Sequence, residues 1–143
     1  MTTVNELLRY KGAEIVTIDP DSTVYDALTL MSRRNIGALL VIEKGRLVGV
    51  LSERDYARKV ILHGRSSKTT SVRKIMSEHF IAVKPATPVE ECMGIMTEKR
   101  VRHLPVLDGD KLIGVVSIGD VVRAIIDDRE FTIQQLERYI CCG

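Results

Sequence analysis

The sequence has few cysteines, little net charge and no long hydrophobic run. Only three of its 143 residues are cysteines, and none forms a Cys-x-x-Cys pair, so neither a disulfide framework nor a zinc site is expected. The formal net charge of +2 is not the strongly basic balance of a dedicated nucleic-acid binder. No segment is apolar enough for a signal peptide or a membrane span, so the sequence predicts a cytoplasmic protein with no membrane partner.

The chain also lacks the motifs that are typical of catalysis. It contains neither a Walker A sequence nor Gly-x-Gly-x-x-Gly, and no serine lies in a nucleophile elbow. Its three histidines, His63, His79 and His103, have no metal-ligand spacing. The sequence therefore predicts a protein that is not an enzyme, and a redox role for Cys141 and Cys142 is the remaining catalytic alternative.

What the sequence does contain is an internal repeat. A shift of 65 positions lays the chain on itself without a gap and places Pro20 on Pro85, Leu39 on Leu104 and Asp55 on Asp120. Two copies are too few for a solenoid, so they predict a pseudo-two-fold pair that shares one core. The expected division is 1–71 for the first unit, with an N-terminal helix and the linker, and 72–143 for the second, with a C-terminal helix.

Each copy is predicted to be a βαββα unit of mixed α/β (α+β-like) class. Strands at 15–18 and 80–83 precede helices whose apolar residues recur at i, i+3, i+4 and i+7. Hairpins follow at 38–51 and 104–116, and Pro105 is expected at a strand start or an edge. Thr87 is expected to cap the second helix, with Pro88 at its first position. The last helix of each copy is expected to bury Ala57, Val60 and Ile61, or Val122, Ile125 and Ile126.

The sharpest motif is Gly-x-x-Ser-x-x-Asp, which occurs at residues 49–55 and again at 114–120. One interpretation is a capping box, in which serine and aspartate satisfy the free amides of a helix start without any ligand. The other interpretation uses the same geometry for binding. The serine and the helix amides would hold a phosphate, the aspartate would accept from two ribose hydroxyls, and the glycine would allow close approach. Recurrence of the motif in both copies favours binding.

A second cluster, at residues 100–105, enters the hairpin of the second copy with Arg102 and His103, where the first copy has small residues at 35–38. Cations on one side and small residues on the other suit a cleft that holds a phosphate and a flat base. The same two cations are equally explained as a solvated helix end that complements the helix dipole. Spacing alone leaves both interpretations open.

The doubled unit, the two Ser–Asp helix starts and the Arg-His-Leu-Pro-Val strand resemble a CBS-domain pair, or Bateman module, over about residues 4–126. The resemblance implies a freestanding regulatory module with no obligatory cofactor. Such a module binds AMP, ADP, ATP, NAD or S-adenosylmethionine between its two units, forms a homodimer and acts on an unknown protein target. The alternative is an interaction module that kept the fold and lost the ligand.

Carried over by position, the resemblance assigns nucleotide-binding residues to two clefts. The main cleft would use Asp120 for the ribose and cations for the phosphate, and would comprise Val16, Thr17, Ile36, Gly37, Ala38, Arg102, His103, Ser117 and Asp120. The second cleft would comprise Ser52, Arg54, Asp55, Ile81 and Val101, and it lacks the cationic pair. The loop at 63–71 and the tail helix at 131–140 lie outside the repeat and are the expected output surfaces.

Overall fold

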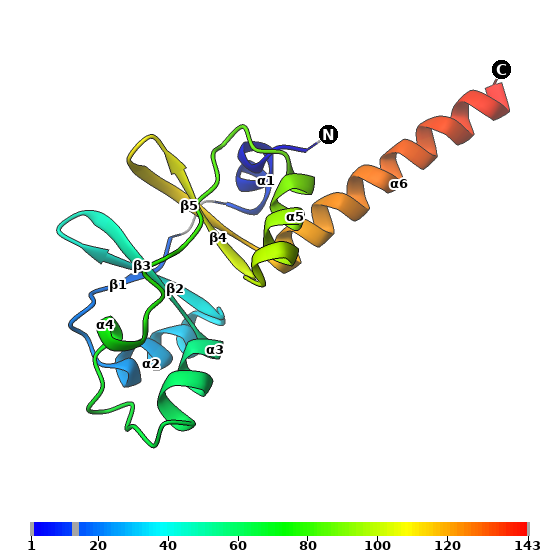
Figure 1. Cartoon of the computed structure of the whole chain (residues 1–143). Helices are drawn as coiled ribbons and strands as arrows, with labels where there is room; N and C mark the ends of the chain where they lie inside the picture. The colour runs from blue at the N-terminus through cyan, green and yellow to red at the C-terminus, as the bar shows by residue number, and fades with distance from the viewer. Residues whose placement is uncertain (1, 13–14, 143) are drawn as a thin grey trace. The chain divides into compact units, whose positions relative to one another are not determined.

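A computed structural model describes residues 2–12 and 15–142 and divides the chain into two compact units (Figure 1). Unit 1 comprises Met1–Glu14 together with Ala82–Gly143, and unit 2 comprises Ile15–Ile81. Both units combine helices with a small sheet, so the predicted α/β class is confirmed.

Unit 2 is built on a three-stranded sheet. The strands β1 (Thr17–Ile18), β2 (Ala38–Glu43) and β3 (Arg46–Ser52) lie in that order, with β1 parallel and β3 antiparallel to β2. The helix α2 (Val24–Arg34) connects β1 to β2. After β3 come α3 (Glu53–Tyr56), a π-helical segment (Ala57–Ile61) and the short helix α4 (Val72–Ile75). The core of the unit includes Met31, Leu39, Val41 and Leu51.

Unit 1 is built on a two-stranded hairpin. Its strands are β4 (His103–Asp108) and β5 (Lys111–Ser117), which pair antiparallel. Its helices are α1 (Val4–Lys11), α5 (Val89–Lys99) and α6 (Ile118–Cys142). In Figure 1, α6 runs beside α5 and then continues well past it.

The two units repeat each other at the level of single side chains. Met31 and Met96 are both 2% exposed, which confirms that these methionines are core residues. The hairpins share one register, with Ala38 opposite Ser52 and His103 opposite Ser117, and each has a bulge at the equivalent position. The internal repeat is therefore a structural repeat.

The segment at 80–83 forms one bridge instead of the predicted strand. In unit 2, the Leu40 amide donates to the Val16 carbonyl at 3.3 Å and so joins β1 to β2. The equivalent of Leu40 is Pro105, which has no N–H to donate. Only Val83 pairs, through bonds of 2.9 Å to Pro105 and Leu107. Pro105 lies inside β4 and not at its start, but β4 is an edge of the two-stranded sheet, which confirms the other half of the expectation. The side of Pro105 that lacks a donor faces this segment, because the Pro105 carbonyl accepts from Val83.

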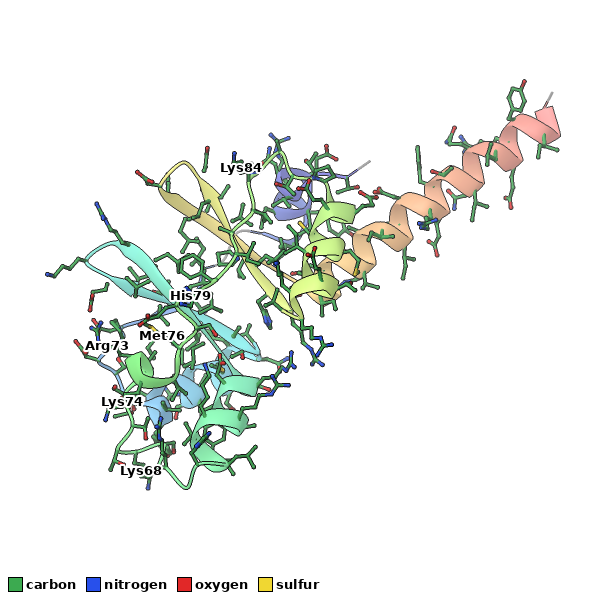
Figure 2. All side chains as sticks on the ribbon, viewed as in Figure 1. Lys68, Arg73, Lys74, Met76, His79 and Lys84 are labelled. Carbon is green, nitrogen blue, oxygen red and sulfur yellow. The ribbon has the colours of Figure 1, made fainter. Side chains whose placement is uncertain are left out.

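The N-terminal helix packs with the second repeat, which differs from the expected boundary at residue 71. The amides of Val4 and Asn5, at the start of α1, donate to the carbonyls of Thr87 and Pro85 at 2.8 Å. In unit 2 the start of α4 is held in the same way, because Val72 and Arg73 donate to residues 22 and 20. α1 and α4 are thus equivalent elements, and each contacts the unit formed mainly by the other half of the predicted division. Arg73, labelled in Figure 2, also donates to Asp21 and Glu43.

Three local expectations are wrong. The N-cap of α5 is Pro88, not Thr87, whose hydroxyl accepts from the Lys84 amide at 3.1 Å instead. After the Ser–Asp motif, Val60 and Val121 are buried, whereas several residues predicted to be buried are exposed: Ala57, Ile61, Val122 and Ile126. The burial of Ala57, Val60 and Ile61 was predicted from a period of 3.6 residues per turn. The segment Ala57–Ile61 is a π-helix with a longer turn, so its side chains point in other directions than that period implies. The tail at 131–140 is not a separate helix but part of α6.

Two glycines provide a matched test of packing. A Cβ at residue 49 would lie 2.7 Å from Met76 Sδ and 3.1 Å from the Ser77 carbonyl oxygen, whereas a Cβ at Gly94, within α5, would meet nothing within 4 Å. We expect Gly49→Ala to lower the free energy of unfolding by about 1–3 kcal/mol through overpacking. Gly94→Ala should raise it by about 0.5–1 kcal/mol through helix propensity. Urea unfolding of both variants measures the difference, and equal effects would contradict the packing described here.

Candidate functional site

Each unit presents a Ser–Asp helix start at the end of its hairpin. In unit 2 the Asp55 amide donates to Ser52 Oγ at 3.2 Å, and the Ser52 amide donates to Asp55 Oδ2 at 2.9 Å. In unit 1 the Asp120 amide and Ser117 Oγ are also 3.2 Å apart, and the Ser117 amide lies 2.9 Å from Asp120 Oδ2. Both motifs therefore form the capping box that was one of the two interpretations of the sequence. This use occupies one carboxylate oxygen, Oδ2, of each aspartate.

A lysine from the other end of the chain lies on the unit 1 motif. Lys11, the last residue of α1, donates through Nζ to Asp120 Oδ2 at 2.6 Å and to the Val115 carbonyl at 3.0 Å. Arg123 makes a longer contact, of 3.4 Å, with the other oxygen of Asp120, Oδ1. Burial opposes ionisation of Asp120, but the hydrogen bonds from Lys11 and the Ser117 amide outweigh it and lower the pKa of the carboxyl. Asp120 is therefore an anion that is held by two cations.

Unit 2 reaches a similar arrangement with a local lysine. Lys59 Nζ lies 3.3 Å from Asp55 Oδ1 and donates to the Ile75 carbonyl at 2.9 Å. Sequence reasoning missed both lysines. Lys59 could have been found, since it lies four residues after Asp55 on one helical face. Nothing in the local sequence connects Lys11 with Asp120, which lies 109 positions away.

The glycines of the two motifs are explained by packing against the protein itself. A Cβ at Gly114 would lie 2.8 Å from Leu8 Cδ2, and Gly49 is covered in the same way by Met76, which is labelled in Figure 2. In unit 1 the side chain that requires the glycine comes from α1, and in unit 2 it comes from the residue that follows α4. Close approach was predicted here, but the group that approaches is a side chain of the same unit.

The predicted cation cluster lies beside the unit 1 motif. His103 is opposite Ser117 in the hairpin, and the Arg102 carbonyl accepts from the Ile118 amide at 2.9 Å. In unit 2 the Gly37 carbonyl accepts from the Glu53 amide at 3.0 Å in the equivalent bond. Burial is the main cause that lowers the pKa of His103. The charge of Asp120 opposes this effect, and the positive charges of Lys11 and Arg102 add to it.

The depressed pKa of His103 predicts a pH dependence of stability. Below its ordinary value of 6.5 the unfolded chain binds a proton that the folded chain resists, so the free energy of unfolding should fall as the pH drops through this range. We expect His103→Gln to flatten this part of the profile in urea unfolding between pH 7.5 and 5.5. His79→Gln, which removes an imidazole at an exposed position, is the matched control. Identical profiles for the two variants would contradict the prediction.

Each unit has an open groove beside its motif. In unit 1 a groove of about 740 Å³ is lined by Lys11, Asp120, Arg123 and, on its α1 side, the exposed Tyr10. In unit 2 a groove of about 630 Å³ is lined by Ile36, Gly37, Glu53 and Tyr56 among others. The first groove offers charged groups, and the second offers small and apolar residues next to the start of α3.

The predicted site residues therefore gather into two clusters, one in each unit. Unit 1 brings together four of them: Arg102, His103, Ser117 and Asp120. Unit 2 brings together another five around the ends of its hairpin: Gly37, Ala38, Ser52, Arg54 and Asp55. The others lie as follows: Val16 and Thr17 beside β2, Ile36 before it, Ile81 in the segment before Val83, and Val101 after α5. Each predicted cleft draws on both units, so the clefts themselves stay predictions.

Among residues 2–12 and 15–142, no group of three or more histidine, cysteine, aspartate or glutamate side chains could hold a metal ion. No described helix is long and apolar enough to cross a membrane.

Comparison with known proteins agrees with the repeat. The family model for the CBS domain matches twice, at residues 4–62 and 72–127. The chain is 43% identical over 151 residues to the mitochondrial CBS domain-containing protein CBSX3 of Arabidopsis thaliana, covering 99% of this chain and 73% of the relative. CBS-domain pair proteins are regulatory modules.

Solved structures show the same fold. A protein with CBS domains from Burkholderia ambifaria MC40-6 is 50% identical, with a TM-score of 0.86, covering 89% of this chain and 96% of that one. The CBS domain pair of protein MJ0100, in complex with 5′-methylthioadenosine and S-adenosyl-L-methionine, is 22% identical with a TM-score of 0.77. It covers 90% of this chain and 98% of the MJ0100 chain. At that identity the second likeness concerns the fold alone.

Proposed function

Because the chain belongs to the CBS-domain family, we propose that it is a sensor that binds an adenosine compound at its Ser–Asp helix starts. The observation that carries this proposal is the pairing of a carboxylate with an ammonium group at the unit 1 motif. Asp120 and Lys11 lie 2.6 Å apart at the edge of an open groove. A ribose cis-diol both donates and accepts hydrogen bonds, so it complements such a pair.

The capping box leaves room for this use. It occupies Asp120 Oδ2, while the contact of Oδ1 within the described part of the chain is the 3.4 Å one with Arg123. A ribose hydroxyl that donates to Oδ1 would meet an aspartate already fixed by the cap. The entropy cost of ordering this side chain on binding would therefore be small. Lys11 and Arg123 contact the same carboxylate, and the charge of Arg102 acts on His103 beside it. These three cations are proposed to supply the positive charge for a phosphate. The main cleft is accordingly proposed to prefer AMP, ADP, ATP or NAD, with no obligatory cofactor.

The Asp55 motif is proposed as the weaker, second binding site. Asp55 is paired with Lys59, and Ser52 donates to the same carboxylate at 3.0 Å. Both capping boxes also serve a module without any ligand, so an interaction module that kept only the fold is the competing function. The MJ0100 pair holds two adenosine compounds, and this makes adenosine compounds the first class to test.

Signalling is proposed to occur by population shift. A ligand changes an arrangement of the units, or of a homodimer, only as far as it binds one arrangement better than another. The loop at 63–71, which is exposed at residues 63–66, 68 and 69, and the end of α6, on the face that carries Phe131, are the proposed output surfaces toward an unknown protein target. Nucleic acid and membranes are not among the proposed partners. The cytoplasm stays a prediction, and the Arabidopsis relative is named as mitochondrial.

A thermal-shift panel tests the proposal. AMP, ADP, ATP, NAD and S-adenosylmethionine are compared with GMP, which keeps the ribose and phosphate and changes the base. A ligand at 100 times its Kd adds about 2.7 kcal/mol of stability, which should raise Tm by about 5–10 °C. We expect at least one adenosine compound to reach this range and GMP to stay below it. A panel without any shift would favour the interaction module.

A further inference from the structure

The second half of α6 is a helix without a tertiary partner in its own chain. Every described side chain from 129 to 140 is exposed, and Figure 1 shows this part of α6 beyond the end of α5. Isolated helices of about 12–15 residues are marginal in water. Yet this segment carries large apolar side chains, among them Ile133 at 54% and Leu136 at 57% exposure. A helix of this kind gains its stability by covering such a face.

The exposed apolar residues follow a seven-residue repeat. Ile126, Ile133 and Ile140 are seven positions apart and occupy heptad position a, and Val122 and Leu136 occupy position d. These five side chains form one narrow stripe along α6, which we call the α6 seam. Phe131, which is 62% exposed, lies on the opposite face of the helix at position f. A stripe with a period of 3.5 residues is typical of a coiled-coil surface, not of a helix that covers a globular core.

We propose that the α6 seam binds the α6 seam of a second copy of this chain, in a parallel two-stranded coiled coil. Isoleucine at a with leucine at d favours two parallel strands. A second copy presents the same stripe, so the two surfaces are complementary by symmetry. The part of the seam beyond residue 129 is separate from the proposed ligand-binding groups, so the interface does not rest on the proposed function.

Charges along the seam agree with the parallel orientation. The remaining d position is Arg129, and Glu130 follows it at position e. In a parallel pair, a d side chain packs beside the e side chain of its partner, so Arg129 would meet Glu130 of the partner subunit twice across the interface. In an antiparallel pair the e positions would face each other instead and would bring Glu130 close to Glu130 of the partner subunit.

Molar mass in solution tests the interface. The full chain and the double variant Ile133→Asp/Leu136→Asp are compared by light scattering after gel filtration, with Phe131→Asp as the matched control on the opposite face. We expect the seam variant to have half the mass of the native chain and Phe131→Asp to keep the native mass. Circular dichroism should show less helix for the seam variant, and its thermal unfolding should remain cooperative. An unchanged mass for the seam variant, or an equal loss in both variants, would overturn the proposal.

A charge exchange tests the orientation. Arg129→Glu places four acidic groups around one layer and should weaken the association at least about tenfold in sedimentation equilibrium. The double variant Arg129→Glu/Glu130→Arg restores opposite charges only in the parallel register and should recover the native association. Failure of the double variant to recover it would overturn the parallel arrangement.

Discussion

Replacing Leu8 with alanine is expected to lower the free energy of unfolding by about 2–5 kcal/mol, the cost of a large-to-small change in a core. Leu8 is 6% exposed and lies directly over Gly114 in β5. Glycine cannot fill the space that the shortened side chain leaves, so a cavity should remain. Leu62→Ala is the matched control, because Leu62 is 77% exposed and its loss should change stability by less than about 0.5 kcal/mol. Urea unfolding measures both variants.

The Leu8→Ala variant should also show which of the two units loses stability. Leu8 belongs to unit 1, although the nearest repeat in the sequence is the one that forms unit 2. Hydrogen exchange should therefore show weaker protection of β4 and β5, with the protection of β2 and β3 less affected. Weakened protection of β2 and β3 alone would contradict the assignment of α1 to unit 1.

Replacing Asp120 with alanine is expected to reduce the affinity for AMP and ATP at the main cleft by at least about 100-fold. The variant removes the acceptor proposed for two ribose hydroxyls, and hydrogen bonds to charged groups contribute about 1.5–3 kcal/mol each. It also leaves the Lys11 ammonium without its carboxylate partner. Calorimetric titration of each variant measures the affinity. Asp55→Ala should affect only the weaker, second binding site.

Asp120→Ala also removes a helix cap, so its effect needs a control for stability. Thr3→Ala removes the cap of α1, where the Glu6 amide donates to Thr3 Oγ1 at 3.3 Å. Both variants should lose about 1 kcal/mol of stability. Only Asp120→Ala should lose the ligand. Native affinity in the Asp120 variant would leave the capping box as the whole role of the motif.

Much of the fold could be predicted because the 65-residue repeat allows each assignment in one copy to be compared with the equivalent position in the other. Each buried position that was assigned in one copy could be compared with its partner, as Leu39 with Leu104, and both are fully buried. The hairpins were clear because two short apolar runs flank a turn in each copy. The repeat led to a wrong prediction for the strand at 80–83. Pro105 stands where the first copy has Leu40, and it lacks the amide that Leu40 donates to the neighbouring segment.

The rest depends on contacts that local sequence does not encode. α1 is a short amphipathic helix with three buried residues, and nothing in its pattern indicates which hairpin it covers. For the same reason, the pairing of Lys11 with Asp120 could not be predicted. The Ser–Asp motifs were located correctly, but the choice between cap and ligand remained open, because both uses require the same two side chains at the same helix start.

The most direct test removes one hydroxyl from the ligand. Calorimetry compares AMP with 2′-deoxy-AMP, and ATP with 2′-deoxy-ATP, on the native chain. If the carboxylate of Asp120 accepts the ribose hydroxyls, the deoxy compounds should bind about 10-fold to 100-fold more weakly, and the difference should vanish in Asp120→Ala. Equal affinities for the ribose and deoxyribose forms, or no heat of binding for any of the four, would contradict this role.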